Sequence, residues 1–271
     1  MDKKIIYINS IIIALLAAIA NISGLFWKNL YQNDTISITA QMMGQDLITL
    51  IIVLPLLLIS IYLIVRNSLK GRLMWMGIMF YFIYTYASMS FLASYNQLFL
   101  VYVAILALSL YTFMGEILTM KIEDIREIFT PGRINKITAI YLFLAGLMLA
   151  AMWISMIIGS LISGVAPAAL ESYTTLVIQA LDLAVVVPAS IIAGCLLIKG
   201  KLWGYILASI FLIKAALLGT AILSMILFMV LNGVSVAMGQ VIFFFLLTVV
   251  GIIIALAFYN NIQENNSITR G

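Results

Sequence analysis

Eight long apolar segments, separated by short polar turns, divide this chain of 271 residues. A helix that crosses the hydrocarbon core of a bilayer, about 30 Å thick, needs roughly 20 mainly apolar residues. The segments have that length, and they are too long for the roughly 10-residue strands of a membrane barrel. The sequence therefore predicts an all-α integral membrane protein with eight transmembrane helices. The predicted spans cover residues 5–26, 48–65, 73–94, 98–120, 137–160, 175–198, 204–230 and 241–259.

Composition excludes several classes of function. Hydrophobic residues make up 65% of the chain and charged residues 9%, whereas soluble domains contain about 25% charged residues. The sequence has no histidine, which excludes histidine-ligated haem, histidine metal sites and histidine-dependent triads. Its single cysteine, Cys195, cannot form an internal disulfide. We therefore expect no cofactor and no metal site.

Basic residues indicate the orientation in the membrane. With the N-terminus in the cytoplasm, all of the 14 Lys and Arg residues except Lys28 and Lys214 fall on the cytoplasmic side. They are spread over short loops, so the net charge of +4 does not indicate a nucleic-acid partner. The sequence predicts a multi-pass protein of the cell (plasma) membrane with both termini cytoplasmic. Its expected partners are membrane lipid and either a small polar solute or other membrane proteins.

The two halves of the chain resemble each other. Val53-Leu-Pro55, a basic turn at residues 71–75 and an aromatic run at 80–86 recur in the same order at 186–188, 200–203 and 211–214. The second turn is taken as four residues shorter, which aligns Thr85 with Lys214. A four-span unit returns the chain to its starting side, so the pattern predicts two tandem parallel four-helix repeats.

The repeats define the expected domain organisation. Residues 1–120 form the first repeat and 137–260 the second. Charged residues alternate with apolar ones in the linker 121–136, which suits a short helix lying on the cytoplasmic face of the membrane. Residues 261–271 form a cytoplasmic tail.

Two charged residues lie deep in predicted spans. Lys214 is roughly 15 Å from the start of the seventh span, and Asp182 is about 10 Å from the outer end of the sixth. A charge inside the bilayer is costly, which makes such a residue a functional candidate. Because the two spans are consecutive and antiparallel, we expect Asp182 and Lys214 to pair. The alternative is that the pair only fixes the register of the two helices.

Further polar side chains are expected around this pair. Gln179 lies one helical turn before Asp182, and Tyr81, Tyr84 and Thr85 lie in the third span, where packing and anchoring are the alternative role for the tyrosines. Pro55 and Pro188 are expected to kink the second and sixth spans, and Gln45 and Asp46 lie at the outer end of the second. The predicted substrate-binding residues are Asp182, Lys214, Gln179, Tyr81, Tyr84 and Thr85, and no catalytic residue is predicted.

Glu116 and three tryptophans receive ordinary explanations. Glu116 lies near the inner end of the fourth span, where we expect it to be solvated. Trp27, Trp75 and Trp203 lie at the ends of spans, as the aromatic belt of membrane proteins predicts.

Three functions are compatible with these features. The first is a carrier or channel for a small polar or charged solute, with Asp182 and Lys214 near the bilayer midplane at the repeat interface. The second is a non-transporting sensor, assembly or partner subunit. The third is an intramembrane lipid-modifying enzyme, which is weakened by the absence of a nucleophile elbow, a phosphate-binding loop and paired membrane carboxylates.

Overall fold

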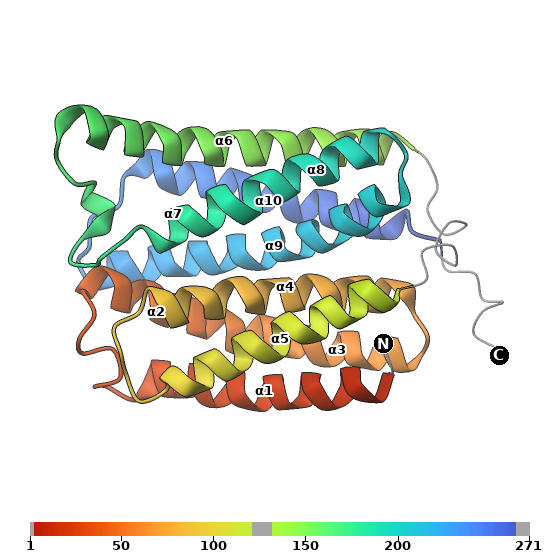
Figure 1. Ribbon diagram of the computed structural model, residues 1–271, viewed down its shortest axis with the longest axis horizontal. Helices are drawn as coiled ribbons and strands as arrows, with labels where there is room; N and C mark the ends of the chain where they lie inside the picture. Colours follow the sequence, from red (N-terminus) through yellow and green to blue (C-terminus); the bar gives the residue numbers. More distant parts are fainter. Residues whose placement is uncertain (1–2, 121–131, 264–271) are drawn as a thin grey trace. The chain divides into compact units, whose positions relative to one another are not determined.

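The computed structural model describes residues 3–120 and 132–263, which form helices joined by short turns (Figure 1). The first half contains α1 (Lys3–Phe26), α2 (Ile36–Ile48), the π-helix η1 (Thr49–Val53), α3 (Leu54–Val65), α4 (Leu69–Phe91) and α5 (Phe99–Thr119). The second half contains α6 (Arg133–Ser163), the 3₁₀ turn η3 (Ala168–Leu170), α7 (Val177–Leu181), the π-helix η4 (Asp182–Val186), α8 (Val187–Ile198), α9 (Leu202–Leu231) and α10 (Met238–Asn260). Most of the predicted interfacial helix and of the predicted tail lies outside the described residues.

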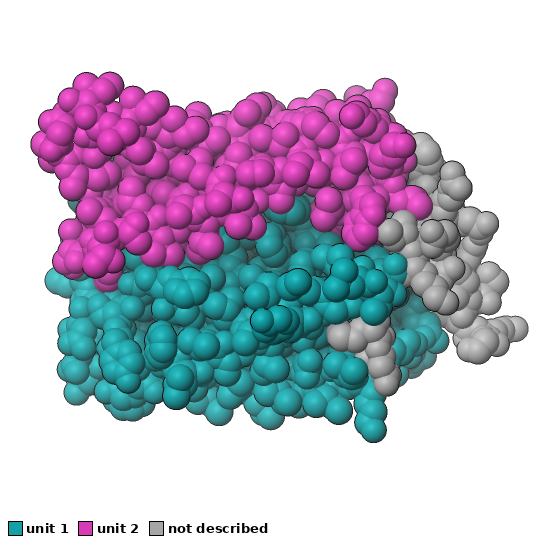
Figure 2. Space-filling view, viewed as in Figure 1, with its two compact units in different colours: residues 1–130, 209–271 teal, residues 131–208 magenta. Residues whose placement is uncertain are grey.

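The helices fall into two compact units (Figure 2). The first unit holds residues 1–130 and 209–271, which include α1 to α5, most of α9, and α10. In it, α4 packs against α3 and α5, and α1 packs against α2 and α5. The second unit holds residues 131–208, where α6 packs along α8.

Seven helical segments among the described residues are long and apolar enough to cross a membrane. They are Lys3–Phe26, Ile36–Val65, Phe99–Thr119, Arg133–Ser163, Val177–Ile198, Leu202–Leu231 and Met238–Asn260. The exposed side chains of α1 include Ile8, Ile12, Leu15, Ile19 and Ile22, whose spacing of three or four residues places them on one face. Apolar faces of this size need lipid rather than water around them, so the chain is a multi-pass membrane protein.

Helix α4, which corresponds to the predicted third span, is not among these seven segments. Tyrosines, serines and threonines lower its hydropathy, yet most of its residues are buried. A helix enclosed by protein needs no apolar surface toward lipid. The buried Nε1 of Trp75 in α4 donates a hydrogen bond of 2.8 Å to Ser10 Oγ of α1. The prediction that Trp75 belongs to the aromatic belt was therefore wrong.

The second span begins earlier than predicted. Residues 36–47 were expected in an outer loop, but they form most of α2. Thr35 caps the helix, since its side chain accepts a hydrogen bond of 3.2 Å from the backbone N–H of Ile38. The polar residues Gln45 and Asp46, predicted at the outer end of the second span, are buried within the protein.

The same local structure occurs twice at a constant offset. In both halves a π-helix precedes a proline-containing helix: η1 and Pro55 in α3, and η4 and Pro188 in α8. The proline ring clashes with the carbonyl of the preceding turn of an α-helix, and a wider π turn relieves that clash. The two π-helices begin at Thr49 and Asp182, and helices α4 and α9 begin at Leu69 and Leu202. The offset in residue number is the same for both pairs.

The turns that follow also match. Asn67 has a φ of 61° and Gly200 a φ of 63°. In the first turn the backbone N–H of Ser68 donates a 3.0 Å hydrogen bond to Leu63 O. In the second turn the backbone N–H of Lys201 donates a 3.0 Å hydrogen bond to Leu196 O. This is the Schellman ending of an α-helix. The second turn is therefore not four residues shorter, and that part of the predicted alignment was wrong.

A glycine allows close helix packing after each turn. A Cβ on Gly71 would lie 2.3 Å from Leu63 Cβ, and one on Gly204 would lie 2.3 Å from the backbone nitrogen of Leu197. Nothing lies within 4 Å of such a Cβ at Gly159 in α6.

We predict that Gly204→Ala lowers the free energy of unfolding by about 1–3 kcal/mol, because backbone atoms cannot move aside as a flexible side chain can. Gly159→Ala is the matched control and should leave stability unchanged or raise it by up to about 1 kcal/mol. Denaturant unfolding in detergent measures both values. Equal effects of the two substitutions would show that the contact at Gly204 does not hold α8 against α9.

Candidate functional site

One face of α4 carries the polar side chains predicted for the third span. Tyr81, Tyr84, Thr85 and Ser88 are spaced by three or four residues, and all four are buried in the first unit. Because other helices enclose α4, these hydroxyl groups find their partners inside the protein rather than in water.

Helix α2 and the π-helix η1 supply some of these partners. Gln45 Nε2 donates a 2.6 Å hydrogen bond to Thr85 Oγ1, and the hydroxyl groups of Thr49 and Tyr81 lie 2.8 Å apart. Thr49 Oγ1 also donates to the backbone oxygen of Gln45, at 2.9 Å. The structure thus brings Tyr81 and Thr85 together, and adds Gln45 and Thr49 to the predicted set.

Lys214 lies against the same helix. It is 3% exposed, and its Nζ lies 4.2 Å from the centroid of the Tyr84 ring and 6.0 Å from that of Phe80. A cation over an aromatic face is attracted to it, and the attraction reaches about 2 kcal/mol away from water. Close packing allows this approach, because a Cβ on Gly77 of α4 would lie 2.5 Å from Ile213 Cβ of α9. Lys214 and Tyr84, both predicted site residues, are therefore neighbours.

Asp182 is buried in the second unit, where it begins η4. Its Oδ2 accepts a 2.8 Å hydrogen bond from Trp153 Nε1 of α6. Gln179, the other predicted residue of this segment, is 7% exposed and lies one turn earlier. Trp153 was not predicted as a site residue. Its position far from either end of a long apolar segment could have indicated that its indole N–H has a buried partner.

The constant offset between the two halves relates these residues. Thr49 is the first residue of η1, and Asp182 is the first residue of η4. Likewise, Tyr81 lies as many residues after the start of α4 as Lys214 lies after the start of α9. At this offset Lys214 corresponds to Tyr81 and not to Thr85, with which the sequence alignment matched it. Thr49 and Tyr81 carry hydroxyl groups in hydrogen-bonding contact.

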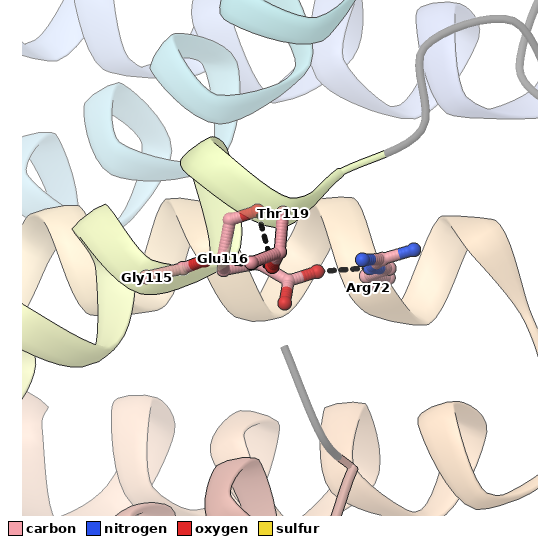
Figure 3. A network of polar contacts seen from close by, with 4 residues as sticks. All are labelled: Arg72, Gly115, Glu116 and Thr119. Atoms are coloured by element: carbon pink, nitrogen blue, oxygen red, sulfur yellow. Dashed lines mark hydrogen bonds and ion pairs between the residues drawn. The ribbon is translucent and has the colours of Figure 1, made fainter.

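Glu116 is buried, although it was expected to be solvated. It is 0% exposed and forms an ion pair with Nε of Arg72 in α4 (Figure 3). Thr119 Oγ1 donates a 2.7 Å hydrogen bond to the backbone oxygen of Gly115 beside this pair (Figure 3). The prediction failed because the position of Glu116 near a span end suggests access to water, whereas the start of α4 covers it.

Asp46 is a further buried carboxyl group that was not in the predicted site. It is 2% exposed, and its Oδ2 accepts a 2.8 Å hydrogen bond from the hydroxyl of Tyr31, in the loop between α1 and α2. Burial raises the pKa of Tyr31 well above its ordinary value. The Tyr31 hydroxyl therefore remains protonated, and able to donate, well into the alkaline range.

No group of three or more His, Cys, Asp or Glu side chains that could hold a metal ion occurs in the part of the chain that the structure describes. Comparisons of the chain with protein-family models, with curated proteins and with solved structures find no match.

We predict that Tyr84→Leu lowers the free energy of unfolding by about 1–2 kcal/mol more than Tyr84→Phe does, because only phenylalanine keeps an aromatic face for Lys214. Denaturant unfolding in detergent measures the difference. In the Lys214→Met background the difference should shrink, since no cation remains. An unchanged difference would mean that the ring serves packing alone.

Proposed function

We propose that this protein is a carrier or channel for a small polar or charged solute, which binds at Asp182 and Lys214. The observation that carries the proposal is the equivalence of these residues with Thr49 and Tyr81. The first copy holds a hydrogen-bonded pair of hydroxyl groups, 2.8 Å apart, where the second copy has a carboxylate and an ammonium. This equivalence supports a shared role for Asp182 and Lys214 in binding the solute.

The proposal includes two tandem parallel repeats and eight spans. The repeated π-helices, prolines and Schellman turns support the repeats. They also support α4 as the eighth span, since its counterpart α9 is long and apolar enough to cross a membrane. The basic residues of the turns at 66–72 and 199–201 support a cytoplasmic location for both turns and for both termini, in the cell membrane.

The chemistry of the site favours a zwitterionic or anionic solute. A solute carboxylate can replace Asp182 as the partner of Lys214, and a solute amine can take the place of Lys214 beside Asp182. The further proposed solute ligands are neutral donors and acceptors: Gln179, Tyr81, Tyr84 and Thr85. The widened π turns at η1 and η4 leave the backbone less regular, as in the broken helices that line substrate sites of many transporters.

A non-transporting membrane subunit is the second candidate. It is favoured by the burial of both charged groups and by their aromatic neighbours, Trp153 and Tyr84, which already satisfy them within the protein. In that case Asp182 and Lys214 would stabilise the fold and bind no solute.

Solute uptake by proteoliposomes tests the choice. We expect the wild type to take up at least one member of a panel of labelled amino acids and small carboxylates. Lys214→Ala and Asp182→Asn should each reduce that uptake by about tenfold or more, because each removes a charged hydrogen bond to the solute. Lys199→Ala is the matched control, since it removes an exposed lysine of the turn after α8.

All variants are compared at equal amounts of folded protein. Equal uptake by Lys214→Ala and the wild type would remove Lys214 from the mechanism. Absence of uptake by the wild type across the panel would favour the non-transporting subunit.

A further inference from the structure

Asp46 of α2 is buried against two preceding segments of the first unit, α1 and the loop 27–35. A Cβ on Gly24 of α1 would lie 1.8 Å from Asp46 Oδ2 and 2.6 Å from the Tyr31 hydroxyl oxygen. Only glycine at this position leaves room for the hydrogen-bonded pair of Asp46 and Tyr31.

Tyrosines rather than cations surround Asp46 in the described part of the chain. Among the described residues Asp46 forms no ion pair, and its hydrogen bond comes from the neutral hydroxyl of Tyr31. The ionisable side chains that interact electrostatically with Asp46 are tyrosines from the loop, α4 and α5: Tyr31, Tyr81, Tyr86 and Tyr102. Among the described residues of this unit Glu116 is a second deeply buried carboxyl, and it is paired with Arg72. The two carboxyl groups therefore have opposite electrostatic surroundings.

An ionised carboxylate that has left water without a cation carries a large desolvation penalty, which a neutral carboxylic acid avoids. Tyr31, which is 5% exposed, lies in the loop 27–35, and its hydroxyl covers Asp46 Oδ2. Release of a proton from Asp46 to water would therefore require Tyr31 to move away. The surroundings thus suit a group that holds a proton when covered and releases it when uncovered.

The second copy has no equivalent of this group. The constant offset that aligns Thr49 with Asp182 also aligns Asp46 with Gln179, whose amide does not ionise. Each copy thus carries one carboxyl group in this helical turn. The carboxyl of the first copy, Asp46, has no cation beside it among the described residues, whereas that of the second, Asp182, has Lys214 as its proposed partner. The two carboxyl groups are suited to different tasks.

We propose that Asp46 is a proton-binding site within the membrane, and that its proton is the ion coupled to solute movement. The coupling rests on the proposed carrier function, whereas proton binding does not. The step is a simple acid dissociation: the Asp46 O–H bond breaks, the proton passes to water on the side of Tyr31, and a carboxylate remains until a proton returns.

Infrared spectroscopy of the reconstituted wild-type protein tests proton binding directly. At neutral pH we expect a carboxylic-acid C=O band that shifts in heavy water, disappears in Asp46→Asn and remains in the matched control Glu171→Gln, which alters an exposed carboxylate. Asp46→Glu should move the band to another frequency, and it serves as the second variant if Asp46→Asn does not fold. A spectrum without a band that depends on Asp46 would overturn the proposal.

Uptake driven by a pH gradient tests the coupling. We expect Asp46→Asn to lose at least tenfold in solute accumulation against a gradient while it still equilibrates solute across the membrane. Accumulation by Asp46→Asn equal to that of the wild type would refute the coupling. If the wild type moves no solute, the carrier function fails, whereas the infrared band still decides whether Asp46 binds a proton.

Discussion

The cost of placing a polar group in hydrocarbon is the constraint on which this structure depends. Every polar side chain in the spans needs a partner within the protein, and the enclosed helix α4 provides many of them. In α4, Trp75 forms a hydrogen bond to α1 and Tyr81 forms one to η1. The ring of Tyr84 in α4 makes a cation–π contact with Lys214 of α9. The apolar faces of α1 and of the other exposed helices cover this polar interior, which allows α4 to be polar in a membrane protein.

The long apolar helices could be predicted from sequence because hydropathy and length alone determine them. Residues 36–47 and Glu116 were misjudged for a shared reason: polarity near a span end indicates either solvent or a buried partner, and only tertiary packing decides between them. The pairing of Asp46 with Tyr31 needed the path of the loop 27–35. The resemblance between the two halves was visible in prolines and aromatic residues, but the offset that aligns their local structures needed the π-helices and turns.

The two halves of the chain differ in chemistry where their local structures match. Thr49 and Tyr81 carry hydroxyl groups in hydrogen-bonding contact, whereas Asp182 and Lys214, at the same offset, carry a carboxyl and an amino group. At this offset Asp46 corresponds to Gln179. This difference suits the proposed division of tasks, in which one half binds a solute and the other a proton.

The proposed pairing of Asp182 with Lys214 is tested most directly by a double-mutant cycle of unfolding free energies in detergent. We expect Asp182→Asn and Lys214→Met each to cost about 3–5 kcal/mol, and the double variant to cost less than either, because no buried charge is then left without a partner. The matched cycle of Thr49→Ala and Tyr81→Phe should show a coupling of only about 1 kcal/mol. Additive losses for Asp182 and Lys214 would show that the two residues do not interact, and would contradict the site.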